Sequence, residues 1–134
     1  MNSRPTAPKQ ILIVDDDAQA REGLALVMEA AGHAVRTAAN GLEALQQLRT
    51  SRADVILLDL AMPTMDGWTF RIQQLGDPAL ADIPVMVLSV GGDSLRPEAA
   101  RLGFVKCFRK ASAGDEILDL LGEVFDVLDQ GGMA

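Results

Sequence analysis

Val55-Ile56-Leu57-Leu58-Asp59 is the stretch of sequence that decides the fold, because four apolar residues end there in one carboxylate. Three other runs of largely apolar residues also end at polar ones: 11–14 before Asp15-Asp16-Asp17, 85–88 before Ser89, and 104–109 before Lys110. Continuous apolar runs are typical of strands that helices cover on both faces, as in a parallel sheet. The carboxyl ends of such strands meet at one edge, where open α/β sheets bind ligands. The sequence therefore predicts that these polar residues gather at one site.

Five strands that alternate with helices are expected along the chain. They fall near 10–14, 34–38, 54–58, 84–89 and 104–109. The second strand is the most polar and is predicted to lie at an edge of the sheet. A chain of 134 residues is large enough to form one domain with its own core. We therefore predict an α/β fold with a doubly wound, five-stranded parallel sheet.

Capping residues and apolar spacing predict five helices. Gly32 can close the first helix in a left-handed conformation, and Asn40 with Glu43 forms a capping-box pattern at the start of the second. The third helix is expected to start near Asp66 and to be followed by a loop over 77–84. The fourth helix is expected at 94–102, and Ser112 is the expected N-cap of the fifth. The predicted inward-facing residues are Ala20, Leu24, Val27, Met28 and Ala31 in the first helix, Leu42, Leu45 and Leu48 in the second, Trp68, Ile72 and Leu75 in the third, and Ile117, Leu120, Leu121, Val124 and Leu128 in the fifth.

The composition excludes several classes of protein. A net charge of −7, from 19 acidic and 12 basic side chains, argues against a nucleic-acid-binding surface, which needs a basic patch. The single cysteine, Cys107, excludes an intrachain disulfide and is expected to be a small buried hydrophobic residue. No apolar stretch reaches the roughly 20 residues that span a bilayer, and residues 1–8 lack the apolar segment of a signal peptide. We therefore expect a cytoplasmic protein that binds neither nucleic acid nor membrane.

The polar residues at the predicted edge form a set suited to phosphoryl chemistry. Mg²⁺ prefers oxygen ligands and is usually held by one or two carboxylates, which Asp16 and Asp59 can supply. Adjacent Asp15 and Asp16 at a strand end cannot point the same way, so one of them can bind the metal directly while the other acts through water. Asp59 stands alone after an apolar strand, where a nucleophilic carboxylate can accept a phosphoryl group. Lys110 and Ser89 can bind phosphoryl oxygens. Singly, each of these residues is more often a cap or a solvated loop residue, but their common edge favours a shared function.

From about Lys9 to Leu128 the chain resembles the receiver domains of two-component response regulators. Two segments carry the resemblance: Ile11-Leu12-Ile13-Val14-Asp15-Asp16-Asp17 and Val55-Ile56-Leu57-Leu58-Asp59-Leu60-Ala61-Met62-Pro63-Thr64-Met65-Asp66-Gly67. The resemblance implies a flavodoxin-like sheet with strand order 2-1-3-4-5. It also implies a receiver domain over residues 9–128, with flexible termini at 1–8 and 129–134.

The resemblance also implies a role for each residue at the edge. Asp59 matches the phosphoacceptor, and Asp16, Asp59 and the backbone carbonyl of Ala61 match the Mg²⁺ site, which Asp15 joins through water. Ser89 matches the hydroxyl switch position, and Lys110 matches the lysine after the fifth strand. The implied phosphodonor is a histidine kinase or a histidine phosphotransfer protein, and the implied output is binding to a downstream target protein. Such a domain is no enzyme in the usual sense, because it catalyses only its own phosphorylation and dephosphorylation.

Four residues depart from the family pattern. Val90 stands where a small residue is usual, Cys107 where an aromatic residue is common, Ala111 where proline usually follows the lysine, and Lys106 where an acidic residue is common. Val90, Cys107 and Ala111 leave an alternative open, a receiver-like docking module that works without phosphorylation. Lys106 disfavours the dimerisation seen in the receivers of transcription factors. A Mg²⁺-dependent phosphatase is a weaker alternative, because Asp59-Leu60-Ala61 lacks a second carboxylate to serve as general acid.

Overall fold

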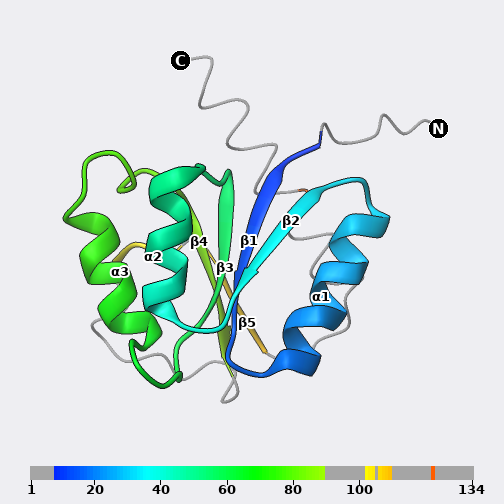
Figure 1. The fold of residues 1–134 in the computed structure, drawn as a ribbon, viewed down its shortest axis with the longest axis horizontal. Coiled ribbons are helices and arrows are strands. Elements are labelled where there is room, and N and C mark those ends of the chain that lie inside the picture. The colour runs from blue at the N-terminus through cyan, green and yellow to red at the C-terminus, as the bar shows by residue number, and fades with distance from the viewer. Residues whose placement is uncertain (1–7, 90–101, 105, 110–121, 123–134) are drawn as a thin grey trace.

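An open parallel sheet forms the centre of the computed structural model, which describes residues 8–89, 102–104, 106–109 and 122 (Figure 1). The strands are β1 (Gln10–Val14), β2 (Ala34–Ala38), β3 (Val55–Asp59), β4 (Val85–Ser89) and β5 (Lys106–Arg109), and the helices are α1 (Ala18–Ala30), α2 (Gly41–Thr50) and α3 (Gly67–Leu75). The strands are ordered β2-β1-β3-β4-β5, and every neighbouring pair is parallel. The predicted doubly wound, flavodoxin-like sheet and the edge position of β2 are confirmed.

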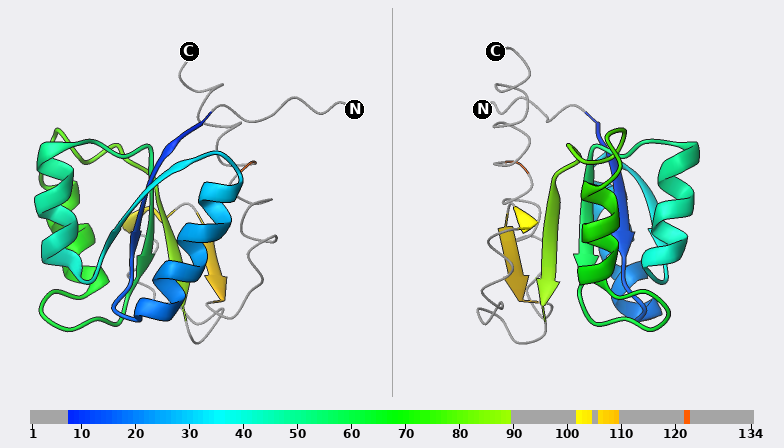
Figure 2. Two further views of the ribbon diagram at one scale, coloured as in Figure 1. Left: turned by 45° about the vertical axis from the view of Figure 1, so that its right-hand side comes forward. Right: turned by 90° about the vertical axis from the view of Figure 1, so that its left-hand side faces the viewer.

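Helices cover both faces of this sheet. Figure 2 shows α1 on one face, with α2 and α3 on the other. Side chains of a strand point alternately to the two faces. In β1, Ile11 and Ile13 pack with Met28 of α1, whereas Leu12 and Val14 belong to the cluster that contains residues of α2 and α3. The apolar runs are therefore buried on both sides, which explains why they carry no alternation of polar residues.

Each described helix begins at a side chain that caps its free N–H groups. The capping pairs are Asp17 with Gln19 and Ala20, Asn40 with Glu43, and Asp66 with Thr69, the first-named side chain accepting from the backbone N–H groups of the others. Gly32 follows α1 at φ 98°, a backbone conformation that glycine adopts without strain. The starts predicted at Asn40 and Asp66 and the closing role of Gly32 are confirmed.

The inner face of α3 differs from the prediction. The expectation that Trp68, Ile72 and Leu75 point inward is wrong, since Ile72 is 59% and Leu75 38% exposed and Trp68 is only partly buried. The buried residues of this helix are Gly67, Phe70, Arg71 and Gln74. These four follow helical spacing, but two of them are polar, so hydrophobicity alone did not reveal the stripe.

Smaller corrections concern α1 and α2. Leu42 is 41% exposed rather than inward, because α2 turns the stripe of Gly41, Ala44, Leu45 and Leu48 toward the sheet. Ala31 is exposed as well, whereas Met28 is buried.

Apart from Leu102 and Gly122, the predicted fourth and fifth helices lie outside the described residues. Ser112, the inward residues of the fifth helix and almost all of both termini lie outside them as well. Within the described part of the chain, no helix combines the length and apolar character that crossing a membrane requires.

Candidate functional site

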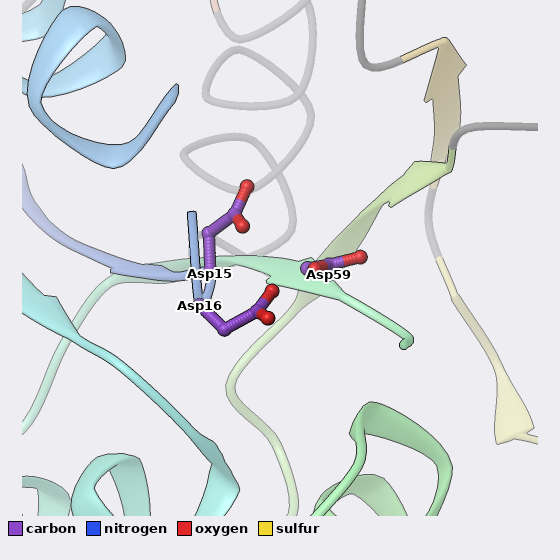
Figure 3. A group of neighbouring side chains, drawn as sticks. All are labelled: Asp15, Asp16 and Asp59. Carbon is purple, nitrogen blue, oxygen red and sulfur yellow. The ribbon is translucent and has the colours of Figure 1, made fainter. Parts of the chain in front are cut away.

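Three carboxylates meet at the carboxyl ends of the central strands. Asp15 and Asp16 follow β1, and Asp59 is the last residue of β3, which pairs with β1 so that Val14 lies beside Leu58. One carboxylate oxygen of each aspartate lies within 4.8 Å of the others (Figure 3). The expectation that these residues gather at one edge is confirmed.

The three aspartates differ in their surroundings. Asp15 is fully buried and Asp59 is 3% exposed, whereas Asp16 is exposed. An Asp15 oxygen, Oδ1, accepts a hydrogen bond from the Asp17 N–H at 2.9 Å. The Oδ1 of Asp59 accepts one from the Ala61 N–H at 3.3 Å. Two carboxylates are thus held in place by backbone donors, while the third faces solvent.

The donor set suits a hard divalent cation. Mg²⁺ binds oxygen ligands at about 2.1 Å, so two ligands on opposite sides of the ion are about 4.2 Å apart. Carboxylate oxygens within 4.8 Å of one another therefore need only small rotations to share one ion. A cation at this place would also relieve the repulsion among three anionic groups.

The loop after Asp59 is held by two glycines. The Gly67 N–H donates to the Leu60 carbonyl at 2.9 Å, and a Cβ on Gly67 would lie 2.5 Å from the Asp59 carbonyl oxygen. On the other side, the Gly41 N–H donates to the Met65 carbonyl at 3.0 Å. The start of α3 therefore rests directly on the backbone of Asp59, and Gly67 is required for that close approach, whereas the start of α2 contacts the loop at Met65.

Two residues support the acidic turn: Asp17, which the sequence marked only as part of the acidic triplet, and Arg21, which it did not single out. Asp17 caps α1 through hydrogen bonds to the Gln19 and Ala20 N–H groups, at 3.0 and 3.3 Å. Arg21 donates from Nη1 to the carbonyl oxygen of Asp15 at 2.7 Å. The capping role of Asp17 was foreseeable from an Asp just before a helix. Nothing in the sequence pattern pointed to Arg21, because the contact depends on how α1 leaves the turn.

The remaining predicted site residues lie at the same edge where the structure describes them. Ala61 stands beside Asp59, and Ser89 ends β4 one position beyond the pairing of Asp59 with Leu88. Outside the description lie the side chains of Ser89, Lys106 and Cys107 and the whole of Val90, Lys110 and Ala111. A shallow pocket of ≈ 320 Å³ lies next to the site, lined by Leu60, Ala61, Met62, Asp66 and Trp68.

The response regulator receiver domain is the family whose sequence model matches this chain, over residues 11–122. The chain belongs to this family. Response regulator MprA of Mycobacterium sp. (strain KMS) is 36% identical to this receiver domain over 97 residues, which are 71% of this chain and 40% of the relative. The CpxR homolog of Haemophilus influenzae, a transcriptional regulatory protein, is 36% identical over 111 residues, which are 81% of this chain and 47% of the relative. The receiver domain thus spans less than half of either relative.

A solved structure of another response regulator has the same fold. The solved structure of the chemotaxis response regulator CheY4 of Vibrio cholerae superimposes with a TM-score of 0.78 and 28% sequence identity, and the match covers 88% of this chain and 99% of that one. The chain is therefore a signalling domain of a two-component system, a class in which histidine kinases are the partners of response regulators. Receiver domains typically bind Mg²⁺ in an acidic pocket, and the aspartate cluster lies where such a pocket is expected.

Proposed function

We propose that this receiver domain accepts a phosphoryl group on Asp59 in a Mg²⁺-dependent reaction and passes the signal on through partner binding. The observation that carries the proposal is the meeting of Asp15, Asp16 and Asp59 at one end of the sheet. In this proposal Asp16, Asp59 and the backbone carbonyl of Ala61 bind Mg²⁺ directly, and Asp15 binds it through water. Membership of the receiver family supports these roles.

The proposed reaction moves one phosphoryl group. A carboxylate oxygen of Asp59 attacks the phosphorus of a phosphohistidine, the new O–P bond forms, and the P–N bond to the imidazole breaks. The departing imidazole nitrogen keeps the electron pair and takes up a proton. With a small acyl phosphate as donor, the leaving group is a carboxylate and needs no proton. Hydrolysis later returns the Asp59 carboxylate and inorganic phosphate, so the chain catalyses only its own phosphorylation and dephosphorylation.

The protein contributes position and charge to this reaction. The 3% exposure of the Asp59 residue and the hydrogen bond from Ala61 limit the orientations of its carboxylate. When bound, Mg²⁺ neutralises charge on the transferring oxygens. We assign the same task to the Lys110 ammonium, and we assign the Ser89 hydroxyl a hydrogen bond to a phosphoryl oxygen, because Ser89 ends β4 and Lys110 comes directly after β5 in the sequence.

The proposal extends to partners and boundaries. The donor is a histidine kinase or a histidine phosphotransfer protein, and the downstream target is a protein. With a net charge of −7, the chain itself is proposed to bind neither nucleic acid nor membrane and to act in the cytoplasm. We place the receiver domain at residues 9–128.

Incubation with a small acyl phosphate and MgCl₂, followed by intact-mass spectrometry, tests the proposal. The expected result is a gain of one phosphoryl group that disappears with EDTA and in Asp59→Asn. Asp82→Asn is the matched control, because it removes the same charge from an aspartate whose side chain is 75% exposed and pairs with Arg52. Phosphorylation that persists in Asp59→Asn contradicts the assignment. A chain that binds Mg²⁺ yet gains no phosphoryl group, even from a histidine kinase, favours the phosphorylation-independent docking module.

A further inference from the structure

Arg21 reaches from α1 to the backbone of the acidic turn. Its Nη1 donates to the carbonyl oxygen of Asp15 at 2.7 Å, and the side chain is partly buried. We infer that Arg21 is a positioning residue for the Mg²⁺ site: it fixes the peptide between Asp15 and Asp16 and thereby aims the Asp16 carboxylate. This inference rests on the proposed function, because it assigns a task in the same site.

The geometry of the peptide bond explains how one contact can orient the next residue. The Asp15 carbonyl and the Asp16 N–H belong to one rigid plane, so a hydrogen bond that holds the carbonyl also holds the nitrogen of Asp16. The other side of Asp15 is fixed as well, since its N–H donates to the Ala38 carbonyl at 3.1 Å. The backbone leading into Asp16 is therefore anchored at both peptides that flank Asp15.

Asp16 depends on this anchoring more than its neighbours do. The carboxylates of Asp15 and Asp59 accept hydrogen bonds from the backbone N–H groups of Asp17 and Ala61. The Asp16 carboxylate is exposed, and within the described residues no hydrogen bond or ion pair holds it. The direction of its Cα–Cβ bond, and so the positions its carboxylate can reach, is thus set by the backbone, which the Arg21 contact fixes.

Because Arg21 is charged, an electrostatic role and a positioning role predict opposite changes in Mg²⁺ affinity when its side chain is removed. A cation close to three carboxylates repels a second cation, so a purely electrostatic role predicts that removing Arg21 strengthens Mg²⁺ binding. A positioning role predicts the opposite, because a ligand that is no longer aimed binds less well. The direction of the change in Mg²⁺ affinity therefore separates the two roles.

Removing the side chain is expected to leave the helix intact. The Arg21 N–H donates to the Asp17 carbonyl at 3.0 Å, a backbone contact that any substitution except proline keeps. Asp17 still caps the first turn through the N–H groups of Gln19 and Ala20. Arg21→Gln and Arg21→Lys should therefore still fold in EDTA and unfold only a few degrees below the wild type, because a single hydrogen bond is lost or weakened. If Arg21→Gln does not fold, Arg21→Lys provides the test.

Calorimetric titration of the whole chain with MgCl₂ tests the inference. Arg21→Gln is expected to raise the Mg²⁺ Kd about tenfold, as expected for the loss of a group that orients a metal ligand. Arg21→Lys should recover part of the loss, because an ammonium can reach the same carbonyl. Arg49→Gln is the matched control and should leave the Kd unchanged, since this exposed arginine lies in the last turn of α2. Unchanged or tighter Mg²⁺ binding by Arg21→Gln overturns the inference.

Phosphorylation kinetics with a small acyl phosphate provide a second readout. At saturating Mg²⁺, Arg21→Gln is expected to need the same acyl phosphate concentration for half-maximal rate as the wild type. A several-fold rise in that concentration assigns Arg21 to donor binding and overturns the positioning role. If the proposed function is wrong, the wild type itself binds no Mg²⁺ or gains no phosphoryl group. If only the role of Arg21 is wrong, the wild type does both and Arg21→Gln binds Mg²⁺ as tightly as the wild type.

Discussion

Arg71 donates from Nη1 to the Oε1 of Gln74 at 2.7 Å, and both side chains are buried on the inner side of α3. The Nε of Arg71 also donates to the Leu102 carbonyl at 2.7 Å, and the Nε2 of Gln74 donates to the carbonyls of Leu80 and Ile83 at 2.9 and 3.0 Å. Burial lowers the pKa of Arg71, but a guanidinium stays charged in proteins. This pair ties α3 to the loop before β4 and to the segment before β5.

Replacing Gln74 by Leu is expected to lower the free energy of unfolding by about 2–4 kcal/mol. The substitution removes three hydrogen bonds of a buried side chain. A hydrogen bond between neutral groups contributes about 0.5–1.5 kcal/mol, and one from a charged guanidinium contributes about 1.5–3 kcal/mol. Urea unfolding measures the change. Gln73→Leu is the control, because Gln73 is exposed on the same helix and its substitution should change the stability by less than about 0.5 kcal/mol.

Gly67→Ala and Gly23→Ala are expected to change stability in opposite directions. A Cβ on Gly67 would lie 2.5 Å from the Asp59 carbonyl oxygen and 2.8 Å from the Leu60 Cα, so the start of α3 must move away from β3. We expect a loss of about 1–3 kcal/mol, the range typical of overpacking. Gly23 has open space within 4 Å in the interior of α1, so alanine there should add up to about 1 kcal/mol.

Thermal unfolding of the two variants measures both signs. Gly67→Ala should also weaken Mg²⁺-dependent phosphorylation, because the displaced backbone carries Asp59, whereas Gly23→Ala should leave phosphorylation at the wild-type rate. Equal Tm values for Gly67→Ala and the wild type would contradict the tight approach of α3 to the end of β3.

Thr64 holds a strained backbone conformation in the loop after Asp59. Its φ is 69°, a left-handed value that costs a β-branched residue about 1–2 kcal/mol. Asn tolerates this conformation, so Thr64→Asn is expected to raise stability by about 0.5–1 kcal/mol. The Tm reports the change. Thr69→Asn, on the exposed side of α3, should have almost no effect, since Thr and Asn have similar helix propensities.

His33 makes stability depend on pH. The side chain is 8% exposed, and its Nδ1 accepts a hydrogen bond from the Lys9 N–H at 3.1 Å. Burial, and secondarily the charge of Lys9, lowers the His33 pKa below its ordinary value of 6.5. The folded state therefore binds a proton less readily than the unfolded state, and the stability that neutral His33 provides is complete only above about pH 6.5.

As the pH falls below 6.5, the wild type is expected to lose stability by at most about 1.4 kcal/mol per pH unit, until the folded-state pKa is reached. His33→Asn keeps an acceptor but cannot titrate, so it should lack this component. Chemical unfolding of both proteins between pH 5 and 8 measures the difference. Because His33 is the only histidine in the chain, its NMR titration gives the folded pKa directly. A value above 6.5 would contradict the prediction.

Asp16→Asn is expected to abolish the stabilisation of the fold by Mg²⁺. At a concentration ten times the Kd, a ligand that binds only the folded state adds about 1.4 kcal/mol. In EDTA the variant should be as stable as the wild type or more so, because one of three clustered charges is gone. Asp17→Asn is the control: asparagine caps a helix as well as aspartate does, and Asp17 lies outside the cluster. Equal Mg²⁺ stabilisation of Asp16→Asn and the wild type would exclude Asp16 as a ligand.

The strands and the acidic edge could be predicted from the sequence because they depend on local order. A strand that helices bury on both faces is an apolar run with polar residues on either side of it. The apolar runs before Asp15 and Asp59 therefore marked both the strands and their carboxyl ends. The caps at Asn40 and Asp66 were equally local, since each satisfies N–H groups within three residues.

Only the tertiary structure decided which side of α3 is buried and what holds the acidic turn. Arg71 and Gln74 can be buried because backbone carbonyls from other segments accept their hydrogen bonds, and the sequence gives no sign of those carbonyls. The contact of Arg21 with the Asp15 carbonyl likewise depends on the path of α1. Hydrophobic patterning shows which side chains are stabilised by leaving water. The burial of a polar side chain depends instead on hydrogen-bond partners that only the folded chain brings within reach.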